Sequence, residues 1–394
     1  MIRKIAQLLM MAAVACGALA GAHAEPVRPA SDQTVVETLA TQMGDRRAQR
    51  QLRQALAKSP RDAGLAVEVA KAHLDLARNQ GDARYAGLAL GALSAWPAGG
   101  PSVPVEVLMM RATVAQYLHD FDGAAALLDA VTQRDPRHAQ AWLTLATVRR
   151  VQGRYADSDA ACRRVGESGQ ALHAQACLAE NLSLVGQNDA ARTRLQQLLA
   201  SPAASGAGGA ATRQWLITTL AELEERAGQP EAAQVAWVRA HALGPSPYVI
   251  TAYADFLLQQ QRPADVLALL QGQDKTDAVL LRLAIAGHRL GVPEAKAWCK
   301  DMQARLEAAA SRPGNGLVHA REQARFALEV LGQPTRALSL ARQNLQHQRE
   351  TTDWLLAVQA AQAQASENVK QSALADISRQ QQRTGISDAR LAPL

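Results

Sequence analysis

The sequence predicts an all-α protein in which antiparallel helix pairs stack into a superhelical solenoid. Three observations support this fold class: the composition of the core, a sequence unit that returns after 34 residues, and the lack of alternating strand patterns. The chain has 394 residues, of which 48% are hydrophobic but only 4% aromatic. Because Ala, Leu and Val must then fill the core, the composition favours closely packed helices.

Residues 1–24 have the pattern of a signal peptide for export. Two basic residues precede the apolar stretch 5–20, and a small-residue cleavage site ends at Ala24. We therefore expect cleavage after Ala24 and a periplasmic location. Lipid attachment at Cys16 is a less favoured alternative, because the leucine usual before such a cysteine is missing. No later stretch holds 18 consecutive apolar residues, so we expect no membrane span.

The charge of the chain is mildly basic and evenly spread. The formal net charge is +6, no run of five or six like charges occurs, and aromatic residues do not alternate with Arg or Lys. Nucleic acid is therefore not an expected partner.

The clearest repeating unit is Ala139–Leu172. Its first helix carries Trp142 on one face and ends at Gly153, which we expect to supply a left-handed turn before an antiparallel second helix. The preceding unit has the same pattern shifted by 34 residues and closes at Pro136, which cannot continue a helix. The two units together predict a repeat of helical hairpins.

This unit resembles the tetratricopeptide repeat (TPR) family. The residues that carry the resemblance are Trp142, Leu145, Ala146, Gly153, Tyr155, Ser158 and Val165, whereas Cys162 stands where the family usually has a large apolar residue. The resemblance implies a superhelix of helix pairs in which the first helix of each pair faces the concave side.

Similar units follow along most of the chain. They are Val67–Ala98, Leu172–Ser205, Gln214–Ser246, Pro247–Gln273, Asp277–Arg312 and Val318–Arg349. Two turns depart from the pattern, since His119 replaces the turn glycine of one unit and Pro247–Gln273 has no glycine at its turn.

These units predict the following organisation. We expect a signal peptide at 1–24, an N-terminal helical segment at 25–62, TPR-like repeats at 63–204, a flexible Ser/Ala/Gly-rich loop at 205–213, further repeats at 214–350, and polar, Gln-rich capping helices with a tail at 351–394.

No motif of catalysis or cofactor binding is present. The sequence has no nucleophile elbow, phosphate loop, dinucleotide fingerprint or His-Glu-x-x-His zinc motif. Since helices account for nearly the whole mature chain, no stretch remains for a separate catalytic domain. We therefore expect no enzymatic activity, no cofactor and no metal.

Cys162 and Cys177 are the two cysteines that neighbouring repeats bring together. The first interpretation is a pair of small core residues, and the second is a disulfide that joins adjacent repeats in an oxidising compartment. A soft-metal site that includes His173 is the third, although the spacing matches no standard zinc pattern. Cys299 is expected to be a buried free thiol.

The resemblance also implies a binding groove on the first helices. At the family's groove positions this sequence has the candidate site residues Arg150, Glu180, Trp215, Glu222, Glu225, Tyr248 and Asp255. The basic side chains with which some TPR proteins bind a peptide's terminal carboxylate are not reproduced. Because carboxylates outnumber basic groups among these positions, we expect a locally negative groove that attracts a basic segment.

The function predicted from the sequence is a non-catalytic periplasmic scaffold that binds a protein or peptide partner in assembly or export. Two alternatives remain open: a carrier whose helical groove holds a glycan or small ligand, and an enzyme of unrecognised type. An open concave channel favours the scaffold, whereas a closed pocket favours the carrier. The partner and the oligomeric state cannot be predicted.

Overall fold

The computed structural model describes residues 31, 43–80, 84–97, 100, 102–205, 209–310 and 319–391. The chain divides into two units, Met1–Ala48 and Gln49–Leu394, and the packing described below belongs to the second. The predicted signal peptide and nearly all of 25–42 lie outside the described residues. Within the described part, no helix has both the length and the apolar character needed to cross a membrane.

The described residues form helices and no strands, so the predicted all-α fold class is confirmed. The helices are α2 (Met43–Lys58), α3 (Ala63–Gln80), α4 (Arg84–Ala92), α5 (Val105–Tyr117), α6 (Phe121–Arg134), α7 (Ala139–Val151), α8 (Tyr155–Glu167), α9 (Ala171–Leu184), α10 (Asn188–Ala200), α11 (Pro202–Ser205), α12 (Ala210–Arg226), α13 (Pro230–Ala242), α14 (Pro247–Gln259), α15 (Pro263–Leu269), α16 (Asp277–Leu290), α17 (Ala295–Ala310), α18 (Ala320–Glu329), α19 (Pro334–Asn344), α20 (Thr351–Gln362), α21 (Glu367–Thr384) and the 3₁₀ helix η1 (Ala389–Leu391).

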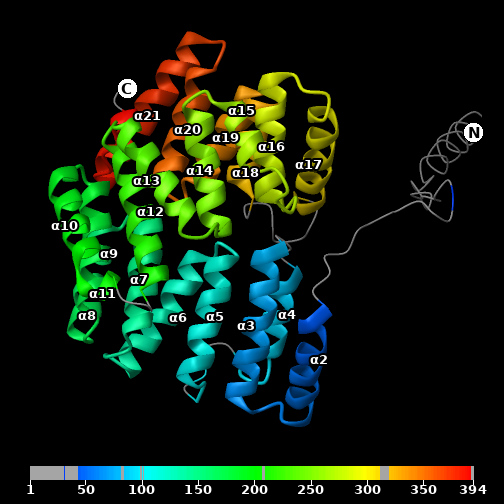
Figure 1. Cartoon of the computed structure of the whole chain (residues 1–394), viewed down its shortest axis with the longest axis vertical. Helices are drawn as coiled ribbons and strands as arrows, with labels where there is room; N and C mark the ends of the chain where they lie inside the picture. Colours follow the sequence, from blue (N-terminus) through cyan, green and yellow to red (C-terminus); the bar gives the residue numbers. More distant parts are fainter. Residues whose placement is uncertain are drawn as a thin grey trace, which may run out of the picture. The chain divides into compact units, whose positions relative to one another are not determined.

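Consecutive helices pack as pairs, which Figure 1 shows in chain order from blue to red. The pairs are α3/α4, α5/α6, α7/α8, α9/α10, α12/α13, α14/α15, α16/α17, α18/α19 and α20/α21. First helices of neighbouring pairs also contact one another, as in α7 with α9 and α16 with α18. We call these first helices the inner helices. Such nearest-neighbour stacking is typical of a helical repeat solenoid.

The turns within the seven helix pairs from α5/α6 to α18/α19 contain a residue with a left-handed backbone conformation. Gly153 has the predicted positive φ of 73°, and His119 and Gln261 adopt φ values of 62° and 57° at the turns that lack glycine. A left-handed conformation therefore does not by itself require glycine at these turns. At Gly186 and Gly228 a second reason applies, because a Cβ there would lie 2.8 Å from Ser387 Oγ and 3.1 Å from Ala389 Cβ respectively.

The core consists mainly of Ala, Leu and Val between the helix layers, as the composition predicts. Trp237 and Trp354 are the largest side chains that are completely buried, and they lie on α13 and α20. Burying such a side chain contributes about 1.5–3 kcal/mol or more of hydrophobic stabilisation. The few aromatic residues are thus placed where the smaller side chains would leave space.

Two predicted boundaries differ from the structure. Residues 210–213, predicted as part of a loop, form the first turn of α12. The segment predicted as polar capping helices begins with α20, which is an inner helix with a fully buried Trp354 rather than a polar cap. Its sequence looks polar because glutamines are interspersed, but its apolar side chains pack between α19 and α21.

Two segments near the C-terminus contact turns of much earlier repeats. The backbone N–H of Arg349 donates to Val151 O (2.7 Å), and its Nη1 donates to Gln152 O (2.9 Å). The N–H of Ser387 donates to Leu184 O (2.8 Å), which anchors the C-terminal segment 385–391. These bonds join parts of the sequence that are about 200 residues apart.

Candidate functional site

The inner helices enclose a cavity of about 790 Å³. Side chains from α7, α9, α12, α14, α16, α18 and α20 line it, and Arg390 of η1 lies at its edge. The seven candidate residues Arg150, Glu180, Trp215, Glu222, Glu225, Tyr248 and Asp255 all face this cavity. Positions that the repeat register placed on one surface are therefore together in space.

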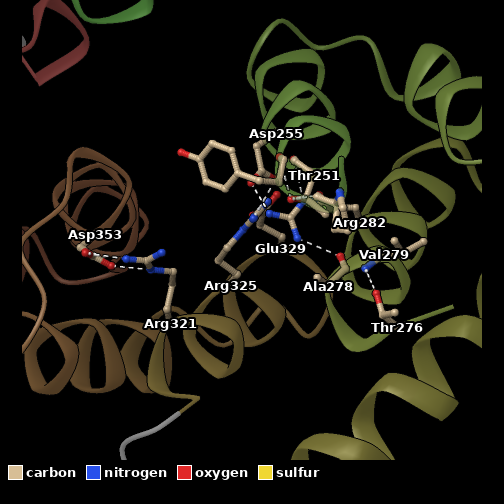
Figure 2. Close-up of polar contacts among 12 residues, drawn as sticks. Thr251, Asp255, Thr276, Ala278, Val279, Arg282, Arg321, Arg325, Glu329 and Asp353 are labelled. Carbon is tan, nitrogen blue, oxygen red and sulfur yellow. Dashed lines mark hydrogen bonds and ion pairs between the residues drawn. The ribbon is translucent and has the colours of Figure 1, made fainter. Parts of the chain in front are cut away.

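Asp255 on α14 is held between two arginines from later inner helices. Its carboxylate pairs with Arg282 and lies 2.8 Å from Arg325 Nη1, and Arg325 Nε in turn lies 3.2 Å from Glu329 (Figure 2). Burial would raise the pKa of Asp255, but the two guanidiniums outweigh burial and lower it. Asp255 is therefore ionised, and the two guanidiniums balance its negative charge.

Glu225 on α12 is neutralised by the C-terminal segment. Arg390 Nη1 lies 2.5 Å from Glu225 Oε2 and also donates to Gln259 Oε1 (2.8 Å). The indole N–H of Trp237 donates to the other oxygen of Glu225 (2.8 Å). Burial raises the pKa of Glu225, while Arg390 and Trp237 favour its ionised form. Glu225 was expected to attract a basic segment of a partner, but Arg390 of the same chain supplies the positive charge.

Glu222 is the candidate carboxylate without an ion-pair partner in the described part of the chain. It accepts a hydrogen bond from the hydroxyl of Tyr248 (2.5 Å), a residue that is 61% exposed and lines the cavity. Burial raises the pKa of Glu222 to about 7, and the positive charge of Arg226 opposes this rise. About half of the Glu222 side chains are therefore protonated at neutral pH.

The predicted negative excess is wrong for the cavity as a whole. The lining carboxylates are Glu180, Glu222, Glu225, Asp255, Glu322, Glu329 and Glu350, and the lining guanidiniums are Arg150, Arg226, Arg282, Arg289, Arg321, Arg325, Arg349 and Arg390. Seven acids face eight arginines, and Glu222 is only partly ionised. The repeat register correctly predicted that the acids on α9, α12 and α14 line the inner surface. It did not predict the arginines that tertiary packing brings to the cavity from α16, α18 and the C-terminal segment.

Arg150 and Glu180 form an ion pair (3.0 Å) at the entrance to a second, smaller cavity of about 280 Å³. Trp215 lies between the two cavities, and its ring stacks on His173 at a centroid distance of 5.9 Å. The inner surface therefore continues from the larger cavity toward α5 and α7 past an aromatic side chain.

Several buried polar atoms in the larger cavity have no hydrogen-bond partner among the described residues. They are Tyr155 Oη, Thr218 Oγ1, Arg226 Nη2, Glu322 Oε2 and Thr351 Oγ1. Buried polar groups are nearly always satisfied in folded proteins, by protein, water or ligand. In the sequence Tyr155 is one of the residues that carry the resemblance to the TPR family, and no local pattern indicates that its hydroxyl lacks a hydrogen-bond partner.

The cysteine pair is bridged. Cys162 on α8 and Cys177 on α9 form a disulfide with a Cα–Cα distance of 5.7 Å, so the first interpretation of two free core thiols is wrong for the structure. His173 contacts Trp215 instead of completing a metal site, and no cluster of three metal-ligating side chains occurs within the described ranges. Cys299 is free and only half-buried.

No family model and no curated protein matches the chain. Among solved structures, a tetratricopeptide repeat protein from Parabacteroides merdae aligns with 66% of this chain and 91% of its own at 14% identity, with a TM-score of 0.43. The TPR domain of P58(IPK) aligns with 80% of this chain and 99% of its own at 16% identity, with a TM-score of 0.23. The helix pairs described above show that the chain is an all-helical repeat solenoid with a TPR-like fold.

The raised pKa of Glu222 predicts a pH-dependent effect of Glu222→Gln on stability. Between pH 4.5 and about 7 the folded protein retains a proton that the unfolded chain releases, so wild-type stability falls as pH rises through this range. An amide does not titrate. We expect Glu222→Gln to raise the free energy of unfolding by about 1–2 kcal/mol at pH 8 and by much less at pH 5.

Urea unfolding at the two pH values measures this difference. Glu231→Gln, at an exposed carboxylate on α13, is the matched control and should have little effect at either pH. An equal stabilisation by Glu222→Gln at pH 5 and pH 8 would contradict the prediction.

Proposed function

We propose that this protein is a non-catalytic periplasmic binding protein whose inner cavity receives a segment of a protein or peptide partner in assembly or export. The observation that carries the proposal is the convergence of seven inner helices on one cavity with Trp215 and Tyr248 at its surface. Helical solenoids bind ligands on such inner surfaces, and aromatic side chains are preferred anchors of protein interfaces.

The disulfide between Cys162 and Cys177 supports the periplasmic part of this proposal. Disulfides persist in oxidising compartments and are rare in the cytosol. The signal-peptide pattern of residues 1–24 gives independent support from the sequence. Intact-mass measurement of the exported protein tests this point, since the mature chain should begin at Glu25 and an intact Met1 would contradict it.

A small-ligand or glycan carrier is the second candidate, and the size of the cavity favours it. Sites for small molecules have volumes of about 300–1,000 Å³, and the cavity of about 790 Å³ lies within that range.

Site-specific crosslinking in the periplasm tests the partner proposal. A photo-reactive residue in place of Tyr248 samples the cavity, and one in place of Val238, which is 50% exposed on the second helix α13, samples another surface. We expect a discrete partner to be captured from position 248 and not from position 238. Hydrolysis of any substrate in a mixed panel by the purified protein would contradict the non-catalytic assignment.

We expect substitution of Trp215 to cause a large loss of affinity for the partner. We expect Trp215→Ala to weaken binding of the captured partner by about 2 kcal/mol, which is about 30-fold, because an aromatic anchor is lost from the centre of the surface. Val238→Ala is the control and should leave affinity unchanged. Isothermal titration measures both variants, and equal binding by the two would exclude Trp215 as an anchor.

A further inference from the structure

The larger cavity is lined by a buried guanidinium that forms no direct ion pair within the described residues, although the charges of Glu222 and Glu225 interact with it. Arg226 on α12 is only 5% exposed, and its Nε donates to Ser183 Oγ (3.0 Å). Its Nη2 has no hydrogen-bond partner, and it forms no ion pair with a carboxylate within the described part of the chain. A buried charge in this state is costly, so its retention points to a missing partner.

In addition to Arg226, two buried hydroxyl groups of the cavity lack a hydrogen-bond partner among the described residues. They are the hydroxyls of Tyr155 (7% exposed) and Thr218 (5% exposed), and both residues line the same cavity as Arg226. Burial raises the pKa of Tyr155 to about 12, and among the nearby charges Arg226 opposes this rise most strongly, which places the two groups close together. Tyr155 is therefore a neutral donor near an unpaired cation.

A second guanidinium in the same region also lacks a carboxylate. Arg349 uses Nε and Nη1 to hold the carbonyls of Leu345 and Gln152 (3.0 and 2.9 Å). Glu350, the carboxylate whose charge acts on Tyr155, is already paired with Arg321 (2.5 Å). Positive charge and free donors thus outweigh negative charge around Tyr155.

Apolar side chains lie between the paired charges of the remaining wall. Leu184, Leu258 and Leu355 line the cavity together with Trp215 and Trp237. An occupant must therefore combine one anionic group with an apolar body, within a volume of about 790 Å³.

We propose that this cavity binds an organic anion, whose oxyanion is held by Arg226 Nη2 with the Tyr155 and Thr218 hydroxyls as further donors. Arginine presents donors in a planar fork that matches a carboxylate or a phosphate, and a charge-assisted bond of this kind strengthens in a water-poor site. The proposal rests on the inner cavity named in the proposed function and specifies the chemical group that it accepts. It reverses the sign expected from the sequence, because Glu180, Glu225 and Asp255 are ion-paired, Glu222 is only partly ionised, and this arginine forms no ion pair.

Binding of three aromatic probes to the exported protein tests this proposal. Benzoate and phenyl phosphate carry the oxyanion, and benzamide is the uncharged match. Quenching of tryptophan fluorescence reports occupancy, because Trp215 and Trp237 line the cavity. We expect saturable binding of at least one anion at one site and at least tenfold weaker binding of benzamide. Equal binding of benzamide and both anions, or none by any probe, would overturn the proposal.

Variants without the unpaired groups identify the site. Tyr155→Phe and Thr218→Val remove hydroxyls that no protein group binds, so both should fold and be at least as stable as the wild type. We expect each to weaken anion binding about threefold to tenfold, and Arg226→Gln to weaken it more than tenfold. Tyr117→Phe is the matched control, since its hydroxyl donates to Ala77 O (3.0 Å) outside the cavity, and it should lose stability but keep anion binding. Unchanged affinity in all three cavity variants would overturn the assignment.

A pair of peptides distinguishes the source of the anion. One peptide has a free C-terminal carboxylate and the other is amidated. If the free peptide binds at least tenfold more tightly than benzoate and amidation removes this gain, the natural anion is the end of a protein chain. If the free peptide and benzoate bind with similar affinity, the natural anion is a free small molecule. The probes require no protein partner. If the anions bind but no partner is crosslinked from position 248, the anion proposal stands and the partner proposal is overturned. If a partner is crosslinked but no anion binds, the partner proposal stands and the anion proposal is overturned.

Discussion

Arg321→Met is expected to destabilise the protein by about 3–5 kcal/mol, because it leaves a completely buried carboxylate without its cation. Asp353 on α20 is fully inaccessible, and both of its oxygens accept bonds from Arg321 (2.6 and 2.8 Å), which Figure 2 shows as a two-pronged contact between α18 and α20. Asn344 Nδ2 and the Glu350 N–H would remain as donors. Uncharged donors cannot replace the lost guanidinium charge.

Urea unfolding measures this loss, and two variants serve as comparison. Arg379→Ala removes one side of an exposed pair with Asp376 and should cost less than about 1 kcal/mol. The double variant Arg321→Met with Asp353→Asn should recover more than half of the loss, since no buried charge remains. A small effect of Arg321→Met, similar to that of Arg379→Ala, would contradict the role assigned to this pair.

Loss of the disulfide is expected to have the second largest effect. The bridge between Cys162 and Cys177 spans a separation of 15 residues and joins α8 to α9. Constraining a loop of this length in the unfolded chain contributes about 3 kcal/mol. Replacing both cysteines by Ala should lower the free energy of unfolding by about this amount, with little change to the native packing of two small buried side chains.

Unfolding of the oxidised and reduced protein gives an independent measurement of the same quantity. Cys299→Ala is the control, because this free thiol is only half-buried. Peptide mapping without reductant should leave Cys299 alone open to alkylation among these three cysteines. Alkylation of Cys162 and Cys177 in exported protein would exclude the bridge.

The fold could be predicted from the sequence because its determinants are local. The spacing of Trp142, Gly153 and Tyr155 depends only on helix geometry within one repeat, and neighbouring repeats have similar patterns. The same register placed Glu222 and Tyr248 on the inner surface. These positions follow from the sequence of a single unit, and no knowledge of distant contacts is required.

The charge of the cavity could not be predicted in this way. Arg325 reaches Asp255 over 70 residues and Arg390 reaches Glu225 over 165, so their pairing depends on how far the stack of helices turns. The register does not define that turn. It also gives no sign that Arg226 Nη2 has no hydrogen-bond partner among the described residues, because this depends on every element around the cavity.

The bonds from the last part of the chain to early repeats have a consequence for how the protein folds. In a simple solenoid each repeat contacts only its neighbours, so folding can spread step by step and the ends can fray alone. Here Gln348 reaches His119 over 229 residues, and Ser387 binds Leu184. Closing such long loops adds sequence-distant contacts, which slow folding and couple the two ends into one cooperative unit. The wall of the cavity includes Arg390 and is therefore completed only when the chain has been synthesised as far as this residue.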